Sequence, residues 1–229
     1  MDTPHSRRRV SLVDYDWSDL IDDEDRVRLL IDPTGPYSVA ASSAMGRAID
    51  DEIVSAADGT AYTGVAGGTS TSYDSNMTVD VQVGISPAAD TGLNVGKLRA
   101  AKQLLDANEA EDDDRFCIIN AKQLQNLLAA TEVTSSDYNT VKTLVNGEVD
   151  TFLGFQFVRT ERIGTDTNSD HKVLFWQRAG MKLALGAEPT VKISERADKN
   201  YATQVFTSMS IGSTRMQEAL VGYIECDPT

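Results

Sequence analysis

The sequence of 229 residues contains only two histidines, His5 and His171, and only two cysteines, Cys117 and Cys226. The cysteines lie far apart, each within an apolar stretch, and the spacing of these four residues matches no common zinc-binding pattern. We interpret both cysteines as small, buried, reduced hydrophobic residues, with a disulfide or a reactive thiol as the alternative. The sequence therefore predicts no metal site.

The shortage of histidine also argues against catalysis. A nucleophilic site needs Ser, Cys or Thr beside a base, together with a third group that orients the base. His5 lies in a terminal segment, His171 follows the polar run 165–170, and no serine occurs in the nucleophile-elbow pattern. Carboxylates are so abundant that any pair chosen as a general acid and base would be arbitrary. We therefore predict that the protein is not an enzyme and binds no cofactor.

Long apolar runs are missing as well. No stretch approaches the roughly 20 apolar residues that cross a bilayer. The first nine residues include three arginines, but no apolar segment follows them, so they do not form a secretory signal. We expect no membrane association and expect the protein to remain in the cytoplasm of the cell that makes it.

Positive charge is scarce: 21 Lys and Arg stand against 35 Asp and Glu, which gives a net charge of −14. Tight DNA binding requires basic groups that neutralise phosphates, so direct nucleic-acid binding is disfavoured. An acidic wall can still enclose nucleic acid, because a wall that repels DNA only has to be closed. The content of 41% hydrophobic and 24% charged residues is typical of a folded globular protein.

Two charged runs are candidates for a subunit interface. The arginines at positions 7–9 form either a solvated strand start or a positive patch that docks onto an acidic neighbouring copy. The acidic run at positions 22–25 lacks the regular spacing and central glycine of a calcium loop, which favours a solvated turn. The candidate interface residues are Arg7, Arg8, Arg9, Asp22, Asp23, Glu24 and Asp25.

The clearest regular element is a helix over residues 36–57. Its apolar residues recur at spacings of three and four, after a breaker with two prolines and before Asp58 and Gly59. Residues 37–57, about 21 in number, correspond to a rod about 30 Å long. Before it, alternation predicts a strand from Val10 to Trp17, then a helical or mixed segment over residues 19–31.

The region after this helix mixes short elements. A glycine-rich loop over residues 60–76 leads to a strand at 77–83, and it lacks the context of a phosphate-binding loop. An inserted α/β subdomain follows. It comprises a helix capped by Asn94, a buried strand at 115–119, a helix that begins at Asn120 with Gln123 completing a capping box, a helix at 139–145 and a strand at 152–158. The remaining expected strands are 171–176, 181–185, 190–194, 201–209 and 219–226.

Several segments resemble, in one order along nearly the whole chain, the major capsid (coat) proteins of tailed bacteriophages. They include YDWSDLIDDED at 15–25, MGRAIDD at 45–51, WQRAGM at 176–181, ERADKNY at 195–201 and VGYIECD at 221–227. The resemblance implies the Hong Kong 97-like fold of that family, in agreement with the α+β order of the elements. It is also more specific than any single short motif.

The resemblance further implies a division of the chain. Residues 1–31 correspond to the returning strand of the extended E-loop and the lead-in to the peripheral (P) domain, and residues 32–92 to the P domain with the spine helix. Residues 93–162 correspond to the axial (A) domain, and residues 163–229 to a β-rich return through the P domain. The N-terminal arm and the first E-loop strand of the family are expected to be missing from this chain.

The implied function is structural. Copies of the protein would form pentamers and hexamers of an icosahedral head shell that encloses phage DNA in the virion, after assembly in the host cytoplasm. Scaffold, portal and decoration proteins are the expected further partners. Two alternatives are an encapsulin-type compartment, which shares the fold, and a hydrolase with an unrecognised site.

Overall fold

The structure, a computed structural model, describes residues 7–22, 34–84, 89–129 and 151–228. The chain divides into two units. Unit 1 consists of Met1–Arg9, Val54–Lys182 and Thr214–Thr229, and unit 2 consists of Val10–Ile53 and Leu183–Ser213. The predicted α+β composition is present, with helices and several separate sheets.

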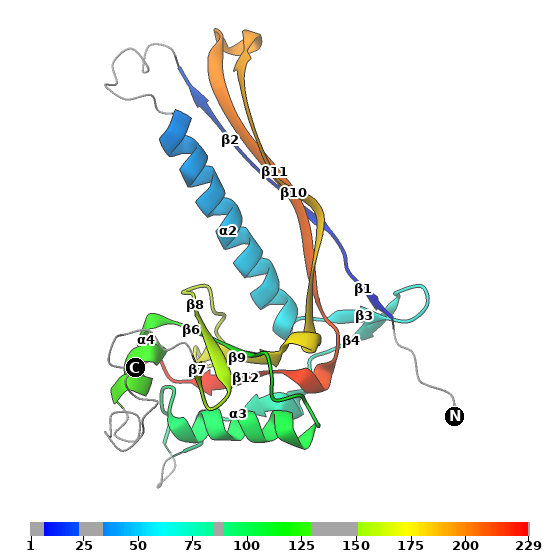
Figure 1. The fold of residues 1–229 in the computed structure, drawn as a ribbon, viewed down its shortest axis with the longest axis vertical. Coiled ribbons are helices and arrows are strands. Elements are labelled where there is room, and N and C mark those ends of the chain that lie inside the picture. The colour runs from blue at the N-terminus through cyan, green and yellow to red at the C-terminus, as the bar shows by residue number, and fades with distance from the viewer. Residues whose placement is uncertain (1–6, 23–33, 85–88, 130–150, 229) are drawn as a thin grey trace. The chain divides into compact units, whose positions relative to one another are not determined.

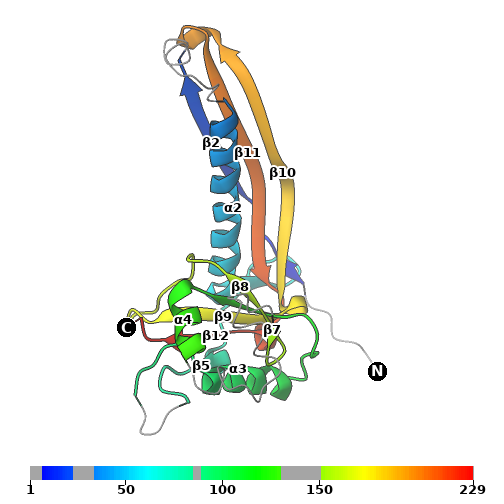
Figure 2. The ribbon, with the colours of Figure 1, turned by 60° about the vertical axis from the view of Figure 1, so that its left-hand side comes forward.

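Unit 2 combines a long helix with a three-stranded sheet (Figures 1 and 2). The helix α2 spans Thr34–Asp58, which confirms the predicted spine helix. The sheet has the order β10-β11-β2, built from Met181–Arg196, Ala202–Arg215 and Val13–Ile21. Strand β11 runs antiparallel to β2.

The core of unit 2 lies between α2 and two of these strands. Met45 of α2 is buried with Met209 and Ile211 of β11. The partly buried residues that pack against this group are Tyr15, Trp17, Ala48 and Ile49. Residues 45, 48 and 49 share one helix face, and alternate strand residues share one sheet face, so each element contributes one apolar side to the core.

Unit 1 is built on a mixed six-stranded sheet of order β5-β12-β9-β6-β8-β7. In that order the strands are Thr78–Val79, Val221–Cys226, His171–Gln177, Arg115–Ile119, Phe155–Arg159 and Thr151–Phe152. Helices α3 (Val95–Ala107) and α4 (Ala121–Ala129) contribute Leu98, Leu105 and Leu127 to its core. A second, three-stranded sheet joins β1 (Arg8–Arg9), β3 (Ala61–Thr63) and β4 (Thr69–Thr71).

The two predicted helix starts in unit 1 are confirmed. Asn94 Oδ1 accepts a hydrogen bond from Lys97 N at 2.8 Å, and Asn120 Oδ1 accepts one from Gln123 N at 2.8 Å. Both satisfy a main-chain N–H that the first helical turn leaves free. Gln123 differs from the expected capping box, because its Oε1 accepts from Leu93 N at 2.7 Å and so joins α4 to the segment that leads into α3.

The sequence prediction was wrong at several short elements. Residues 19–21 belong to strand β2 and not to a helical segment, because Ile21 pairs with Thr203 of β11. The expected strand at 77–83 is reduced to β5. A 3-10 turn, Ser75–Met77, precedes it, and Asp80 Oδ1 accepts from Gln82 N at 2.8 Å just after it. Such an Asx turn competes with strand pairing and ends the strand.

Turn chemistry explains the remaining differences. The expected strand at 152–158 is the hairpin β7–β8, with Leu153 and Gly154 at φ 53° and 87°, as a two-residue primed turn requires. The glycine-rich loop contains strands β3 and β4. The segments 181–185 and 190–194 form one continuous strand, β10, because its edge position tolerates Pro189. The last strand starts at Val221, after a 3-10 turn, Glu218–Leu220. The expected helix at 139–145 lies outside the described residues.

Candidate subunit interface

The three predicted interface arginines do not share one role. Strand β1 pairs with β3, with Arg8 opposite Thr63 and Arg9 opposite Tyr62, so alternate arginines point to opposite sides. The Arg8 side chain is only 8% exposed and forms an ion pair with Glu218. Its Nε also donates to Met216 O at 3.0 Å. Arg8 therefore stabilises its own chain.

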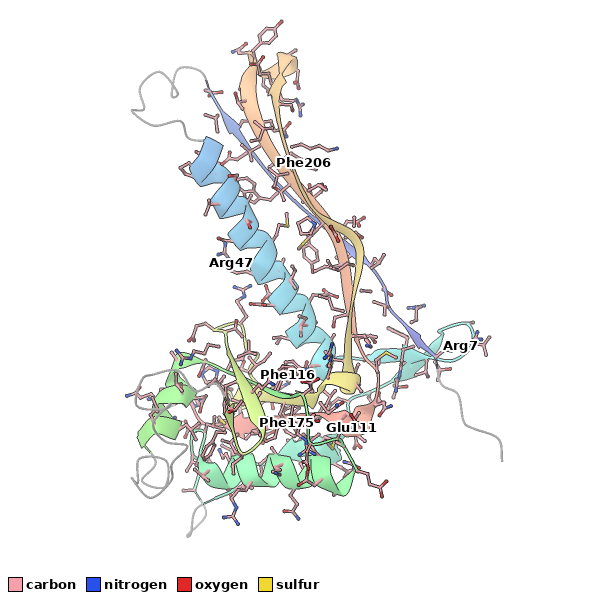
Figure 3. The ribbon with its side chains drawn as sticks, in the orientation of Figure 1. Arg7, Arg47, Glu111, Phe116, Phe175 and Phe206 are labelled. Carbon is pink, nitrogen blue, oxygen red and sulfur yellow. The ribbon has the colours of Figure 1, made fainter. Side chains whose placement is uncertain are left out.

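Arg9 and Arg7 remain on the exposed side of the strand. The guanidinium carbon of Arg9 lies 4.6 Å from the centroid of the Tyr62 ring, within the range of a cation–π contact. Arg7 is exposed, and Figure 3 shows it beside the small β1–β3–β4 sheet. We name Arg7, Arg9 and Tyr62 the basic patch.

Of the predicted acidic run, only the first residue is described. Asp22 is exposed just after strand β2, and Asp23, Glu24 and Asp25 lie outside the described residues. A different acidic segment in unit 1 is well ordered by contacts: residues 109–114, between α3 and β6, which we name the acidic turn. Its residues are Glu109, Ala110, Glu111, Asp112, Asp113 and Asp114.

One buried arginine organises the acidic turn. The Arg115 side chain is 1% exposed and pairs with Asp106 at 2.6 Å and with Asp112 at 3.2 Å. It also donates to the carbonyls of Ala110 at 2.7 Å and Glu111 at 2.8 Å. Charge alone predicts only a solvated turn here. The missed signal was an arginine between an acidic run and a fully apolar strand.

Further contacts fix the end of the turn. Arg178 N donates to Asp114 O at 3.0 Å, and Arg178 Nη1 pairs with the Asp114 carboxylate at 3.1 Å. Gln177 Nε2 donates to Asp113 O at 3.5 Å. Glu111 and Asp113 are thus held through their main-chain carbonyls, while both residues are exposed. The turn presents carboxylates on a fixed backbone.

A second candidate surface lies on β10 in unit 2. The hydroxyls of Thr190 and Ser208 lie 3.5 Å apart, so even-numbered residues of β10 share a face with Ser208. Odd-numbered residues then share the opposite face with Met209, which α2 covers. On β10 this face is exposed and apolar. We name it the β10 stripe, and its residues are Leu183, Leu185, Ala187, Pro189, Val191 and Ile193.

The tip of the β10–β11 hairpin is fixed by charge. Arg196 forms two hydrogen bonds of 2.7 Å with Asp198, and this contact lowers the pKa of the Asp198 carboxyl to about 2. Tyr201 N donates to Arg196 O at 3.0 Å and closes the turn. The Tyr201 side chain is 63% exposed.

Two cations, one buried and one partly buried, also hold the C-terminal turn of α2 within unit 1. Arg215, fully buried, donates to Ala57 O at 2.8 Å and Gly59 O at 2.9 Å. Lys172 pairs with Asp58 at 2.7 Å, and although burial alone would lower the Lys172 pKa, the hydrogen bond from Lys172 to Asp58 raises it. These cations tie the last helical turn to strands β9 and β11.

The two cysteines of the core are unreactive. Cys117 and Cys226 are free and buried; burial raises the pKa of Cys226 to about 12 and also raises that of Cys117. Both thiols are therefore protonated and unreactive at neutral pH. In the described ranges, no group of His, Cys, Asp and Glu could hold a metal ion, and no helix is long and apolar enough to cross a membrane.

Comparison with known proteins relates this arrangement to viral shells. The profile described as phage capsid protein matches residues 1–228. No curated protein matches the sequence. Among solved structures, the capsid of Cyanophage P-SCSP1u has a TM-score of 0.69 and 16% identity, covering 97% of this chain and 74% of that chain.

Other solved structures are similar to the same extent. A chain of Mycobacterium phage Che8 has a TM-score of 0.67 and 13% identity, covering 97% of this chain and 85% of that chain. The capsid of Ralstonia phage GP4 has a TM-score of 0.67 and 14% identity, covering 97% of this chain and 75% of that chain. These similarities confirm the Hong Kong 97-like α+β fold. With the family match over residues 1–228, the chain belongs to the phage capsid protein family and is a structural major capsid protein that forms the head shell.

Proposed function

We propose that copies of this major capsid protein associate into rings of five and six and close an icosahedral shell around phage DNA. The main support for this proposal is the β10 stripe, an exposed apolar face on an edge strand of the described sheet. Proteins normally shorten, charge or cover such an edge, because it invites pairing with another chain. A second copy that covers the stripe would remove this apolar area from water.

The contact between two copies can be modest. Leu185, Val191 and Ile193 are exposed by 55%, 49% and 54%, so roughly half of each side chain is available for burial. A closed lattice multiplies the number of such contacts for each chain, so the assembled shell is far more stable than any one pair. Most of the association energy would then come from apolar contacts, with charges selecting the orientation.

We assign the P and A domains of the family to parts of the two units. Unit 2, with α2 and the long hairpin β10–β11, corresponds to the spine helix and long-stranded part of the P domain. The A domain corresponds to the part of unit 1 that includes residues 93–162, and residues 1–31 to the returning E-loop strand and the lead-in to the P domain. The proposed partners are scaffold, portal and decoration proteins, and the proposed place of assembly is the host cytoplasm. The role is structural and involves no catalytic step.

Substitutions in the β10 stripe test this proposal. Val191→Ser with Ile193→Ser removes apolar surface without changing the charge, and we expect at least about tenfold weaker self-association by mass photometry. Glu188→Gln with Lys192→Gln, on the opposite face of the same strand, is the matched control and should leave association within about twofold. Equal behaviour of the two double variants would contradict the use of the stripe as an interface.

A further inference from the structure

We propose that the basic patch of one copy docks onto the acidic turn of a second copy. This inference rests on the proposed self-association and assigns a specific pair of surfaces to it. Both surfaces lie in unit 1 of every chain, so each copy carries a donor surface and an acceptor surface. Figure 3 labels Arg7 in the first and Glu111 in the second.

The basic patch is held in place before any partner arrives. Gly67 has φ +64°, and a side-chain carbon there would lie 2.8 Å from Arg9 Cβ, so the Arg9 stem packs directly on the glycine backbone. Gly67 N donates to Gly64 O at 3.0 Å and closes the β3–β4 turn beneath it. Tyr62 holds the guanidinium over its ring. A positioned cation loses little conformational freedom on binding, which favours association.

The acidic turn is also held in place within its own chain. Arg115 neutralises Asp106 and Asp112, the nearest carboxylates, and binds two carbonyls of the turn. Within the described residues, the carboxylates of Glu111 and Asp113 have no ion-pair partner, and both residues are exposed. They therefore form a fixed pair of acceptors. Two guanidinium groups of Arg7 and Arg9 match them in charge and number.

A second copy fits the basic patch better than nucleic acid does. Phosphates would also accept from Arg7 and Arg9, but the chain carries a net charge of −14, which opposes the approach of DNA. The acidic turn of another copy offers the same acceptor chemistry on a short, defined segment. A contact between two different surfaces of identical chains can be repeated from copy to copy, as a ring requires.

Charge exchange tests the pairing. We expect Arg7→Glu with Arg9→Glu to weaken self-association about tenfold at about 0.15 M salt, and Glu111→Arg with Asp113→Arg to do the same. The quadruple variant restores opposite charges at the contact, so its association should return to within about threefold of the parent chain. Sedimentation velocity and mass photometry measure association, and circular dichroism checks that each variant folds. Arg99→Glu with Arg47→Glu, two exposed arginines outside the basic patch, is the matched control for net charge.

Each outcome decides the proposal. Weakening by both double variants with recovery in the quadruple variant supports the pairing. Loss of association without recovery, an equal loss in the control, or no effect of either double variant overturns it. An effect of Arg7→Glu with Arg9→Glu on DNA binding alone assigns the basic patch to nucleic acid and also overturns it. A parent chain that assembles while all variants behave alike contradicts only this inference, whereas a parent chain that stays monomeric contradicts the proposed function as well.

Discussion

At the scale of single residues, buried arginines connect segments that are far apart in the chain. Arg215 binds carbonyls 158 and 156 positions away, at Ala57 and Gly59. No local pattern marks such a contact, because both acceptors are main-chain atoms that any sequence supplies. The helix caps at Asn94 and Asn120 could be predicted, since donor and acceptor there lie three residues apart.

Loss of the Arg215 side chain should be costly. Arg215→Met leaves the carbonyls at the end of α2 and the Glu218 carboxylate without their buried donor, and we expect the free energy of unfolding to fall by about 2–4 kcal/mol. Urea denaturation followed by circular dichroism measures it. Arg178→Met, which breaks an ion pair of a side chain that is 75% exposed, should cost less than about 1 kcal/mol. Similar losses in both variants would contradict this assignment.

Asp170 should make the fold less stable at neutral pH. Burial, with the nearby Asp166, Asp227 and Asp90, raises the pKa of its carboxyl, although Lys97 lowers it. A folded pKa above the unfolded one means that the charged form is disfavoured in the fold, and that this penalty disappears as the pH falls through the folded pKa. We therefore expect Asp170→Asn to raise Tm by about 1–3 °C at pH 7.

The pH dependence distinguishes this effect from a general loss of charge. The difference in Tm between Asp170→Asn and the parent chain should become smaller as the pH falls toward about 4, the ordinary pKa range of carboxyl groups. Asp50→Asn, at an exposed position of α2, removes the same charge and should shift Tm less at pH 7. A Tm difference that becomes larger on acidification would contradict the raised pKa of the Asp170 carboxyl.

At the scale of elements, sequence periodicity predicted the helices and strands whose apolar pattern is local. It failed for strands whose length is set by pairing with a distant strand. The helix α2 and strand β6 carry their own apolar pattern, and both were predicted closely. Strand β10 was divided in two at Gly186 and Pro189, because its length comes from pairing with β11. The β10 stripe was missed for the same reason: its alternation becomes visible only when residues 181–196 are taken as one strand.

Two glycines in different elements should respond oppositely to alanine. A side-chain carbon at Gly222 of β12 would lie 2.3 Å from Met77 O and 2.4 Å from the Phe175 ring, whereas at Gly46 of α2 it meets nothing within 4 Å. Gly222→Ala should lower the free energy of unfolding by about 2 kcal/mol or more, and Gly46→Ala should raise it by about 0.5–1 kcal/mol. Denaturant titration of both variants checks this. A stabilising Gly222→Ala would contradict the close packing of β12 against β9.

At the scale of the whole molecule, the fold followed from resemblance and not from periodicity. Element order alone indicated an α+β protein, because the strands of the six-stranded sheet in unit 1 come from five separate parts of the described chain. The arginines at positions 7–9 were singled out together by their charge, but Arg8 forms an ion pair within its own chain. Only strand alternation, which depends on the pairing of β1 with β3, separates Arg8 from Arg7 and Arg9.

Electron microscopy of the purified chain over a range of protein concentrations is the direct test of self-assembly. We propose that copies of this chain associate with one another to build an icosahedral head shell. We therefore expect closed shells with five- and six-copy rings, and ring-sized species at lower concentration. A chain that stays monomeric, or that forms only irregular aggregates at every concentration, would contradict it.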